Sequence, residues 1–147
     1  NTFENMLWEA CQVERIQPID TVCKIHHNLI INDSMAENVP GQAGAIRVKS
    51  LSTAEVYENT IVDSNAYGIL VVGPDASNGT VPVHIHHNRI IRPAQIGAGN
   101  YAGIDFALDL SDGRSSALVE ENIIVSPGTG LGIRVANTHD NITFANN

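Results

Sequence analysis

The segment KIHHNLIIND occupies residues 24–33, and the related segment VHIHHNRIIR occupies residues 83–92. Both place an aliphatic residue, two histidines and an asparagine ahead of further aliphatic residues. The same pattern, with other residues in place of histidine, recurs along the chain. Its asparagines stand at positions 1, 28, 59, 88, 122 and 147, which are 25 to 34 residues apart. A fixed local motif with variable spacing indicates a repeated structural unit joined by loops of variable length.

A second motif lies between the asparagines and consists of a small, an apolar, a variable and another apolar residue. It occurs at 10–13, 45–48, 68–71, 103–106 and 132–135. Alternation of apolar and variable positions is typical of a β-strand with one buried face. Apolar patterns with a helical period are absent. Each period is therefore predicted to hold three short strands, one from this motif and one on either side of the asparagine.

Five such coils stacked on one another make a β-solenoid, and we expect residues 1–147 to form one domain of this kind. Each asparagine is predicted at a tight inner corner, where its amide can bond the asparagine of the next coil about 4.8 Å away. Asn also tolerates the left-handed backbone conformation that tight corners need. The predicted ladder consists of Asn28, Asn59, Asn88 and Asn122.

With these repeats the sequence resembles the right-handed parallel β-helix family of pectate-lyase-like architecture. The resemblance implies an all-β fold, a right-handed parallel β-helix of about five coils. Members of that family include polysaccharide lyases, hydrolases and epimerases, tailspikes, adhesins and non-catalytic modules. The resemblance implies an extracellular or cell-surface module that binds or acts on an acidic polysaccharide. The alternative is a non-catalytic structural or adhesive module that associates with itself.

Composition argues against two other classes of protein. The chain has 8 Lys plus Arg against 16 Asp plus Glu, a formal charge of -8, whereas a general nucleic-acid binder presents a basic surface. No apolar run approaches the roughly 18 residues of a membrane span. The chain opens on Asn1 rather than Met, and we expect it to be a fragment of a longer protein.

Strand alternation also predicts the outer face of the sheet that the second motif forms, here called the first sheet. Related polysaccharide-processing enzymes place their substrate groove across this sheet. The resemblance thus implies binding of an acidic sugar, or acid/base chemistry, by Arg47, Lys49, Asp105 and Arg134. The alternative is ion pairing between coils, Glu14 with Lys49 and Asp105 with Arg134. Leu70 lies at the middle of the same face, where it would interrupt a polar groove.

The segment Arg47-Val48-Lys49 is similar to the Arg-x-Lys element of polygalacturonase-type hydrolases. Those enzymes also carry adjacent aspartates and a Gly-His-Gly segment, and neither occurs in this chain. The sequence therefore contains no complete catalytic constellation. The candidates for catalysis are the same four residues of the first sheet, and whether the chain is an enzyme stays open.

Paired histidines raise the question of a metal site. The pairs His26-His27 and His86-His87 are expected two coils apart, about 9 to 10 Å, which is too far for one zinc ion with bonds of about 2.0 Å. A mixed site would need His27, Glu58 and His87 to converge on one ion. The favoured interpretation is a solvated polar stripe at the corner with His–Glu pairs.

Calcium is the one cofactor that the sequence suggests. Asp109 and Asp112, in the segment DLSDG, offer oxygen ligands from a loop. An ordinary Asp/Gly turn accounts for the same residues, and we favour that interpretation. No metal is therefore predicted.

The strand after each ladder asparagine belongs to what we call the third sheet. If Ile30, Ile61, Ile90 and Ile124 point inward, an apolar stripe remains outside, formed by Leu29, Ile31, Val62, Ile91, Ile123 and Val125. Such a stripe is larger than a protein usually exposes to water. We expect it to be covered by another segment of a longer chain or by a second copy. The unpaired strand edges at the two ends of the solenoid offer an end-to-end route as well.

The two cysteines occupy inward positions on different sheets. Cys11 aligns with Ile46, and Cys23 aligns with Ala54. Facing each other across the core at roughly 10 Å, they exceed the Cα separation of about 7 Å that a disulfide allows. Free thiols are therefore predicted.

Overall fold

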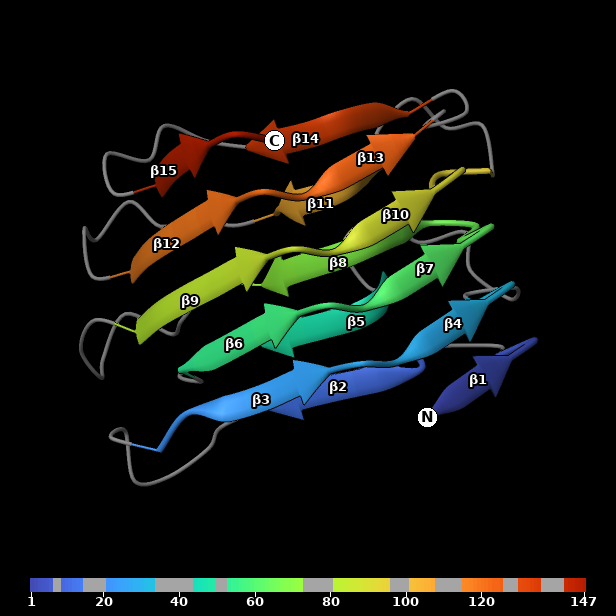
Figure 1. The fold of residues 1–147 in the computed structure, drawn as a ribbon, viewed down its shortest axis with the longest axis horizontal. Coiled ribbons are helices and arrows are strands. Elements are labelled where there is room, and N and C mark those ends of the chain that lie inside the picture. Colours follow the sequence, from blue (N-terminus) through green and yellow to red (C-terminus); the bar gives the residue numbers. More distant parts are fainter. Residues whose placement is uncertain are drawn as a thin grey trace.

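The structure is a computed structural model that describes residues 1–6, 9–14, 21–33, 44–49, 53–72, 81–95, 101–107, 115–125, 130–135 and 142–147. Within that part of the chain, 15 strands form three parallel sheets of five strands each. The chain visits the third, first and second sheets in turn and then begins the next coil. Figure 1 shows the coils stacked from the N-terminus to the C-terminus. The predicted right-handed parallel β-helix of five coils is confirmed.

Each sheet takes one strand from every coil. The first sheet contains β2 (Cys11–Glu14), β5 (Gly44–Lys49), β8 (Tyr67–Val72), β11 (Ala102–Phe106) and β14 (Leu131–Val135). The second sheet, whose strands end at the ladder corner, contains β3 (Cys23–His26), β6 (Ala54–Tyr57), β9 (Val81–His86), β12 (Ser115–Glu120) and β15 (Ile142–Ala145). The third sheet contains β1 (Thr2–Glu4), β4 (Leu29–Ile31), β7 (Thr60–Val62), β10 (Arg89–Ile91) and β13 (Ile123–Val125).

The strand register is the same between successive coils, so residues at the same position of each coil form a straight column along the axis of the β-helix. In the second sheet, for example, Ile25 pairs with Val56, and Val56 pairs with Ile85. Because every coil repeats the same alternation, whole columns point inward or outward together.

In the part of the chain that the structure describes, no helix is long and apolar enough to cross a membrane.

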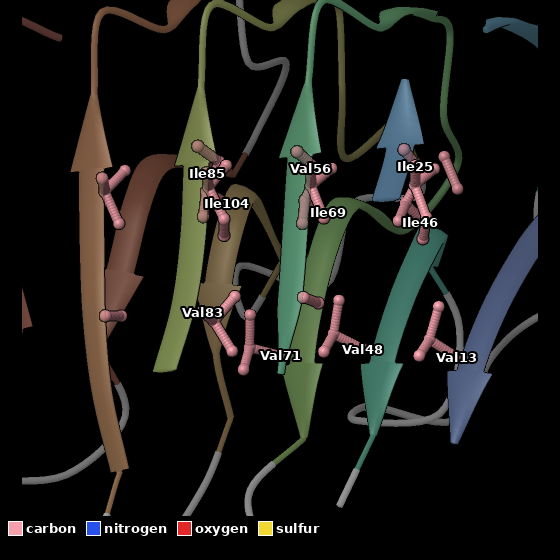
Figure 2. Close-up of a cluster of buried hydrophobic side chains, with 14 of the residues drawn as sticks. Val13, Ile25, Ile46, Val48, Val56, Ile69, Val71, Val83, Ile85 and Ile104 are labelled. Atoms are coloured by element: carbon pink, nitrogen blue, oxygen red, sulfur yellow. The ribbon is translucent and has the colours of Figure 1, made fainter. Parts of the chain in front are cut away.

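The inward columns form one aliphatic core between the sheets. Figure 2 shows the apolar side chains of the first and second sheets meeting between the two layers. The side chains of Ile69, Val56 and Ile61, one from each sheet, have no exposed surface. Burial of an Ile or Val side chain contributes about 1.5 to 3 kcal/mol, so these columns are the main source of stability.

The small residue of the second motif is explained by a close approach between sheets. A Cβ atom added at Gly68 would lie 2.6 Å from the carbonyl oxygen of Gly103 and 2.8 Å from Cγ2 of Ile90. A Cβ atom added at Gly103 would likewise lie 2.8 Å from the carbonyl oxygen of Gly132. Glycine at these positions lets the first sheet begin directly against the inward isoleucines of the third sheet.

The asparagine ladder is present at the predicted corner. Nδ2 of Asn28 donates to Oδ1 of Asn59 at 2.9 Å, and Nδ2 of Asn88 donates to Oδ1 of Asn122 at 2.9 Å. The intervening bond, from Asn59 to Asn88, measures 3.0 Å. These four side chains are buried. The ladder extends to Asn1 at 3.1 Å and to Asn147 at 2.8 Å.

The left-handed residue of this corner differs from the one expected. Positive φ angles of 52° to 55° belong to the residues that precede the ladder asparagines, namely His27, Glu58, His87 and Glu121. The asparagines themselves do not adopt that conformation. Their side chains are held along the axis by bonds to neighbouring coils, so the exposed residue before each of them makes the turn.

Candidate functional site

On the first sheet, the predicted binding residues Arg47 and Lys49 are already paired with carboxylates. Arg47 Nη1 lies 2.7 Å from Oε1 of Glu9, and both side chains are mostly buried, at 15% and 14% exposure. Lys49 Nζ lies 2.9 Å from Oε1 of Glu14, as the ion-pair alternative predicted. An acidic ligand would have to compete with these intramolecular partners.

The other two candidates, Asp105 and Arg134, also pair with each other. Arg134 Nε donates to Oδ2 of Asp105 at 2.7 Å, and the Asp105 side chain has no exposed surface. Burial raises the pKa of Asp105 to about 6, against the opposing effect of the hydrogen bond from Arg134. Arg134 also lies over the ring of Tyr67, 5.8 Å from its centroid. The buried Asp105 therefore pairs with a half-buried cation and does not face solvent.

The middle of the first sheet is closed by a second apolar cluster. Leu70 lies on the outer face, as predicted, but it is fully buried rather than exposed. It packs with Ala66, Tyr67, Ala94 and Tyr101, and the two tyrosine rings meet edge to face at 4.9 Å. Segments from neighbouring coils supply this cover, which strand alternation alone does not reveal. Within the described ranges, a polar groove across this sheet is therefore interrupted at its centre.

The outer face of the second sheet carries a denser set of ionisable side chains. The register aligns Lys24 with Glu55 and Glu55 with His84 in one column. A second column consists of His26, Tyr57, His86 and Glu120. Strands β3, β6, β9 and β12 thus present two neighbouring rows of polar groups to solvent.

Three aromatic rings of the second column are stacked along the axis. The ring centroids of His26 and Tyr57 are 4.7 Å apart with an interplanar angle of 8°, and those of Tyr57 and His86 are 5.1 Å apart with an angle of 2°. The stack therefore joins strands β3, β6 and β9 on the outer face of the second sheet.

Carboxylates link the two columns. Lys24 Nζ lies 2.9 Å from Glu55 Oε2, and His86 Nε2 lies 3.3 Å from Glu55 Oε1. The hydrogen bond from Lys24 is the main cause of a lowered pKa at Glu55, so this carboxylate is ionised at neutral pH. On the next strand, Glu120 Oε1 lies 2.9 Å from His84 Nε2.

The histidines at the corner form separate pairs, as the favoured interpretation predicted. His27 Nε2 lies 2.6 Å from Glu58, and His87 Nε2 lies 2.6 Å from Glu121. The mixed arrangement of His27, Glu58 and His87 is therefore not formed, because each histidine bonds the glutamate of the next coil. The calcium candidates Asp109 and Asp112 lie outside the described residues.

A different group of metal-ligand type is present on the same face. Glu55, His84 and His86 each offer a ligand atom, and these atoms all lie within 4.8 Å of one another. This group was not predicted, because the repeated His-His pair is the more conspicuous histidine pattern in the sequence. The signal was present in His84-Ile85-His86, where both histidines take the outward phase of one strand.

Beside these residues a shallow groove of about 560 Å³ runs along the second sheet. Each coil contributes to it, through Val22, Thr53, Pro82, Ser116 and Thr143 among others. Glu55 and His84 line the same groove. It therefore joins the polar columns to apolar and hydroxyl-bearing positions across all five coils.

The predicted apolar stripe lies on the outer face of the third sheet. Ile30, Ile61 and Ile90 are fully buried, which confirms the predicted phase. Outside them, Leu29, Ile123 and Val125 are 36%, 54% and 39% exposed. The other stripe residues, Ile31, Val62 and Ile91, are half-buried. What the stripe contacts in solution stays a prediction.

Both cysteines are free, as predicted, but they are half-buried rather than fully buried in the core. Burial is the main cause of the raised pKa of the Cys11 thiol and of the Cys23 thiol. Thiols of this kind are poor nucleophiles at neutral pH, because the thiolate is the reactive form. Neither cysteine is therefore a candidate for catalysis.

Comparison with known proteins identifies a family for most of the chain. No curated protein and no solved structure matches it. A family model described as disaggregatase related matches residues 51–145, which include strands β6 to β15 and the group Glu55, His84 and His86. This family is not that of the pectate lyases, so the resemblance drawn from the repeats holds for the architecture. The chain belongs to the disaggregatase-related family.

Proposed function

We propose that this chain is a polysaccharide-binding β-helix module that holds a linear glycan in the groove along the second sheet. The groove itself carries the proposal. It crosses five strands about 4.8 Å apart and is therefore roughly 19 Å long. An elongated groove perpendicular to the strands suits an extended polymer, whereas a compact ligand is usually enclosed in a deeper pocket.

The side chains of the groove match the chemistry of a sugar chain. Sugars present hydroxyl groups, which hydrogen-bond, and apolar C–H faces, which pack against aliphatic surface. Thr53, Ser116 and Thr143 supply hydroxyls, and Glu55 supplies a carboxylate acceptor. Leu118 and Pro82 supply apolar contacts. The mixture supports hydrogen bonding and packing, rather than charge, as the basis of binding.

The charges of the protein give less support to specificity for an acidic polysaccharide, which Arg47 and Lys49 suggested. Of the six Lys and Arg in the described ranges, five take part in ion pairs: Lys24, Arg47, Lys49, Arg92 and Arg134. The net charge of -8 also repels an anionic polymer. We therefore expect glycan binding that depends weakly on salt.

The family description supports a role of this general kind. It connects the chain with disaggregatases, and a glycan-binding module that works outside the cell or at its surface is compatible with that description. The test also separates binding from cleavage, because a module that acts on the glycan releases shortened products. The chain's own residues support binding.

The proposal is tested by titrating the purified chain with a panel of neutral and uronate-containing polysaccharides. Ser116→Trp places a large ring at the centre of the groove and should weaken binding at least tenfold. Gln12→Trp adds the same ring on the exposed face of the first sheet and should leave binding unchanged. Arg47→Ala with Lys49→Ala, at low salt, tests the acidic alternative. Absence of binding to every polysaccharide, or equal binding by Ser116→Trp, would overturn the proposal.

A second candidate function is self-association through the apolar stripe. The specific observation is the exposure of Leu29, Ile123 and Val125 on one face. The proposed occupant is a second copy of this chain, because the continuous apolar column of Ile31, Val62, Ile91 and Val125 repeats at the strand spacing of about 4.8 Å and can match its copy coil for coil. This candidate places the stripe, rather than the groove, at the centre of function.

A further inference from the structure

We propose that Glu55, His84 and His86 form a binding site for a divalent transition-metal ion of the Zn²⁺ type on the outer face of the second sheet. The site goes beyond polysaccharide binding and does not depend on it. It is built from two adjacent strands, β6 and β9, so its ligands project from rigid backbone rather than from loops.

The strand geometry brings the three ligands together. His84 and His86 occupy alternate positions of β9, so both point outward, and their ring centroids are 4.1 Å apart. Glu55 lies directly opposite His84 in the register between β6 and β9. Ligand atoms from the three side chains lie within 4.8 Å of one another. The backbone therefore needs no movement to place all three around one ion.

The distances are close to those of a tetrahedral site. With metal–ligand bonds of about 2.0 to 2.1 Å, two ligand atoms of a tetrahedral zinc lie about 3.3 Å apart. Glu55 Oε1 and His86 Nε2 are separated by 3.3 Å already. Rotation of the His84 ring supplies the third ligand. Two imidazoles and one carboxylate leave a fourth position open, which is the arrangement of zinc sites that accept an exogenous ligand.

Neighbouring groups support the histidines as outer partners do in metal sites. Nδ1 of His86 lies 2.9 Å from Nδ1 of His87, which helps to determine its tautomer. Glu120 Oε1 lies 2.9 Å from Nε2 of His84 and is an outer partner of that ring. The contact with His87 thus holds the His86 imidazole in place before a metal arrives, whereas the His84 ring rotates to reach the ion.

The competing cation for Glu55 is Lys24, and it is easily displaced. Its side chain is 55% exposed, and an ion pair at the surface contributes little to stability because water screens it. The overall charge of -8 attracts divalent cations. Imidazole ligands select Zn²⁺, Cu²⁺ and Ni²⁺ over Ca²⁺ and Mg²⁺, which prefer oxygen.

The test is isothermal titration of the chelator-treated chain with ZnCl₂, with CaCl₂ as the comparison ion. We expect one Zn²⁺ per chain, no comparable Ca²⁺ binding, and a thermal midpoint that rises with Zn²⁺ concentration. Substitution with Co²⁺ should give the visible absorption bands of a four-coordinate site. The variant His84→Gln with His86→Gln should lose at least tenfold in Zn²⁺ affinity.

The matched control is His26→Gln with His27→Gln. It removes one histidine from the second sheet and one from the ladder corner, on the side of Tyr57 opposite to His86. It should retain wild-type Zn²⁺ affinity. If the His84 and His86 variant fails to fold by circular dichroism, the isosteric variant Glu55→Gln decides instead and should also weaken binding at least tenfold. No stoichiometric Zn²⁺ binding, or equal binding in the site variant and the control, would overturn the proposal. Polysaccharide titrations done in the presence of chelator do not depend on the metal. Failure of the metal-site proposal can therefore be told apart from failure of the polysaccharide-binding proposal.

Discussion

The side-chain amide of Asn59 donates a hydrogen bond to the side-chain oxygen of Asn88, 3.0 Å away and one coil further along the helix. The same amide nitrogen lies 2.9 Å from the carbonyl oxygen of Ile25, in the preceding coil. Asn59 therefore joins successive coils at a position that is 1% exposed. Water cannot replace these bonds, so the corner depends on a residue of this shape and polarity.

Replacement of Asn59 or Asn88 by Leu should lower the free energy of unfolding by about 1 to 3 kcal/mol, because buried backbone groups lose their partners. Asn65→Leu, a change to a half-buried bend residue outside the ladder, is the matched control and should change stability by less than about 0.5 kcal/mol. Urea unfolding of the three variants measures the effect. Equal tolerance at all three positions would contradict the role of the ladder.

Gly68→Ala should destabilise the protein by about 1 to 3 kcal/mol, because the added methyl group meets the backbone of the next coil. At Gly132 an added Cβ has no atom within 4 Å. Gly132→Ala should therefore leave stability unchanged or raise it by about 0.4 to 1 kcal/mol, through the unfolded chain. Thermal unfolding of the two variants gives the comparison, and a loss of stability at Gly132 as large as at Gly68 would refute the explanation.

Asp105 should make the protein less stable as pH rises. Its pKa of about 6 in the folded protein lies above the ordinary value of 3.8, so between pH about 4 and 6 the folded state binds more protons than the unfolded state. Stability contributed by the protonated carboxyl is thus present at low pH and is lost as pH rises through about 6. The full shift corresponds to about 3 kcal/mol.

The variant Asp105→Asn isolates this effect because it cannot ionise. Relative to wild type, its free energy of unfolding should increase by about 1 to 2 kcal/mol between pH 4.5 and pH 7.5. Asp63→Asn is the control, since the hydrogen bond from Arg92 is the main cause of a lowered pKa at Asp63. Its relative stability should stay level or fall over the same interval. A pH-independent difference for Asp105→Asn, measured by urea unfolding, would rule out the raised pKa.

Ile91→Lys with Val125→Lys should convert a laterally associated form of the chain into monomer, because two ammonium groups would be buried at the contact. Gln12→Lys with Thr21→Lys adds the same charge at exposed positions away from the stripe and should leave the association unchanged. Sedimentation velocity over a wide concentration range measures the result. Wild-type protein that sediments as a monomer throughout would exclude association through the stripe.

The sequence alone determined the architecture. Each coil of a parallel β-helix repeats the same environment at every position, so the inward residues and the corner asparagine must recur once per coil. Ile25, Val56 and Ile85 illustrate this rule, and so do Asn28, Asn59 and Asn88. Because the rule is local and repeats five times, it can be recognised in the sequence alone. The same alternation assigned Leu29, Ile123 and Val125 to the outer face, where they are exposed.

Only the tertiary structure decided which polar residues meet and which outward residues stay exposed. Leu70 and Asp105 take the outward phase of the first sheet yet are fully buried, because segments from other coils cover that face. Glu55 and His84 lie 29 residues apart in the chain. They pair across β6 and β9 because one full coil, including its loops, separates them. Alternation assigns a side chain to a face, but the interactions on that face depend on coil register and on what packs over it. The candidate site therefore emerged only from the assembled coils.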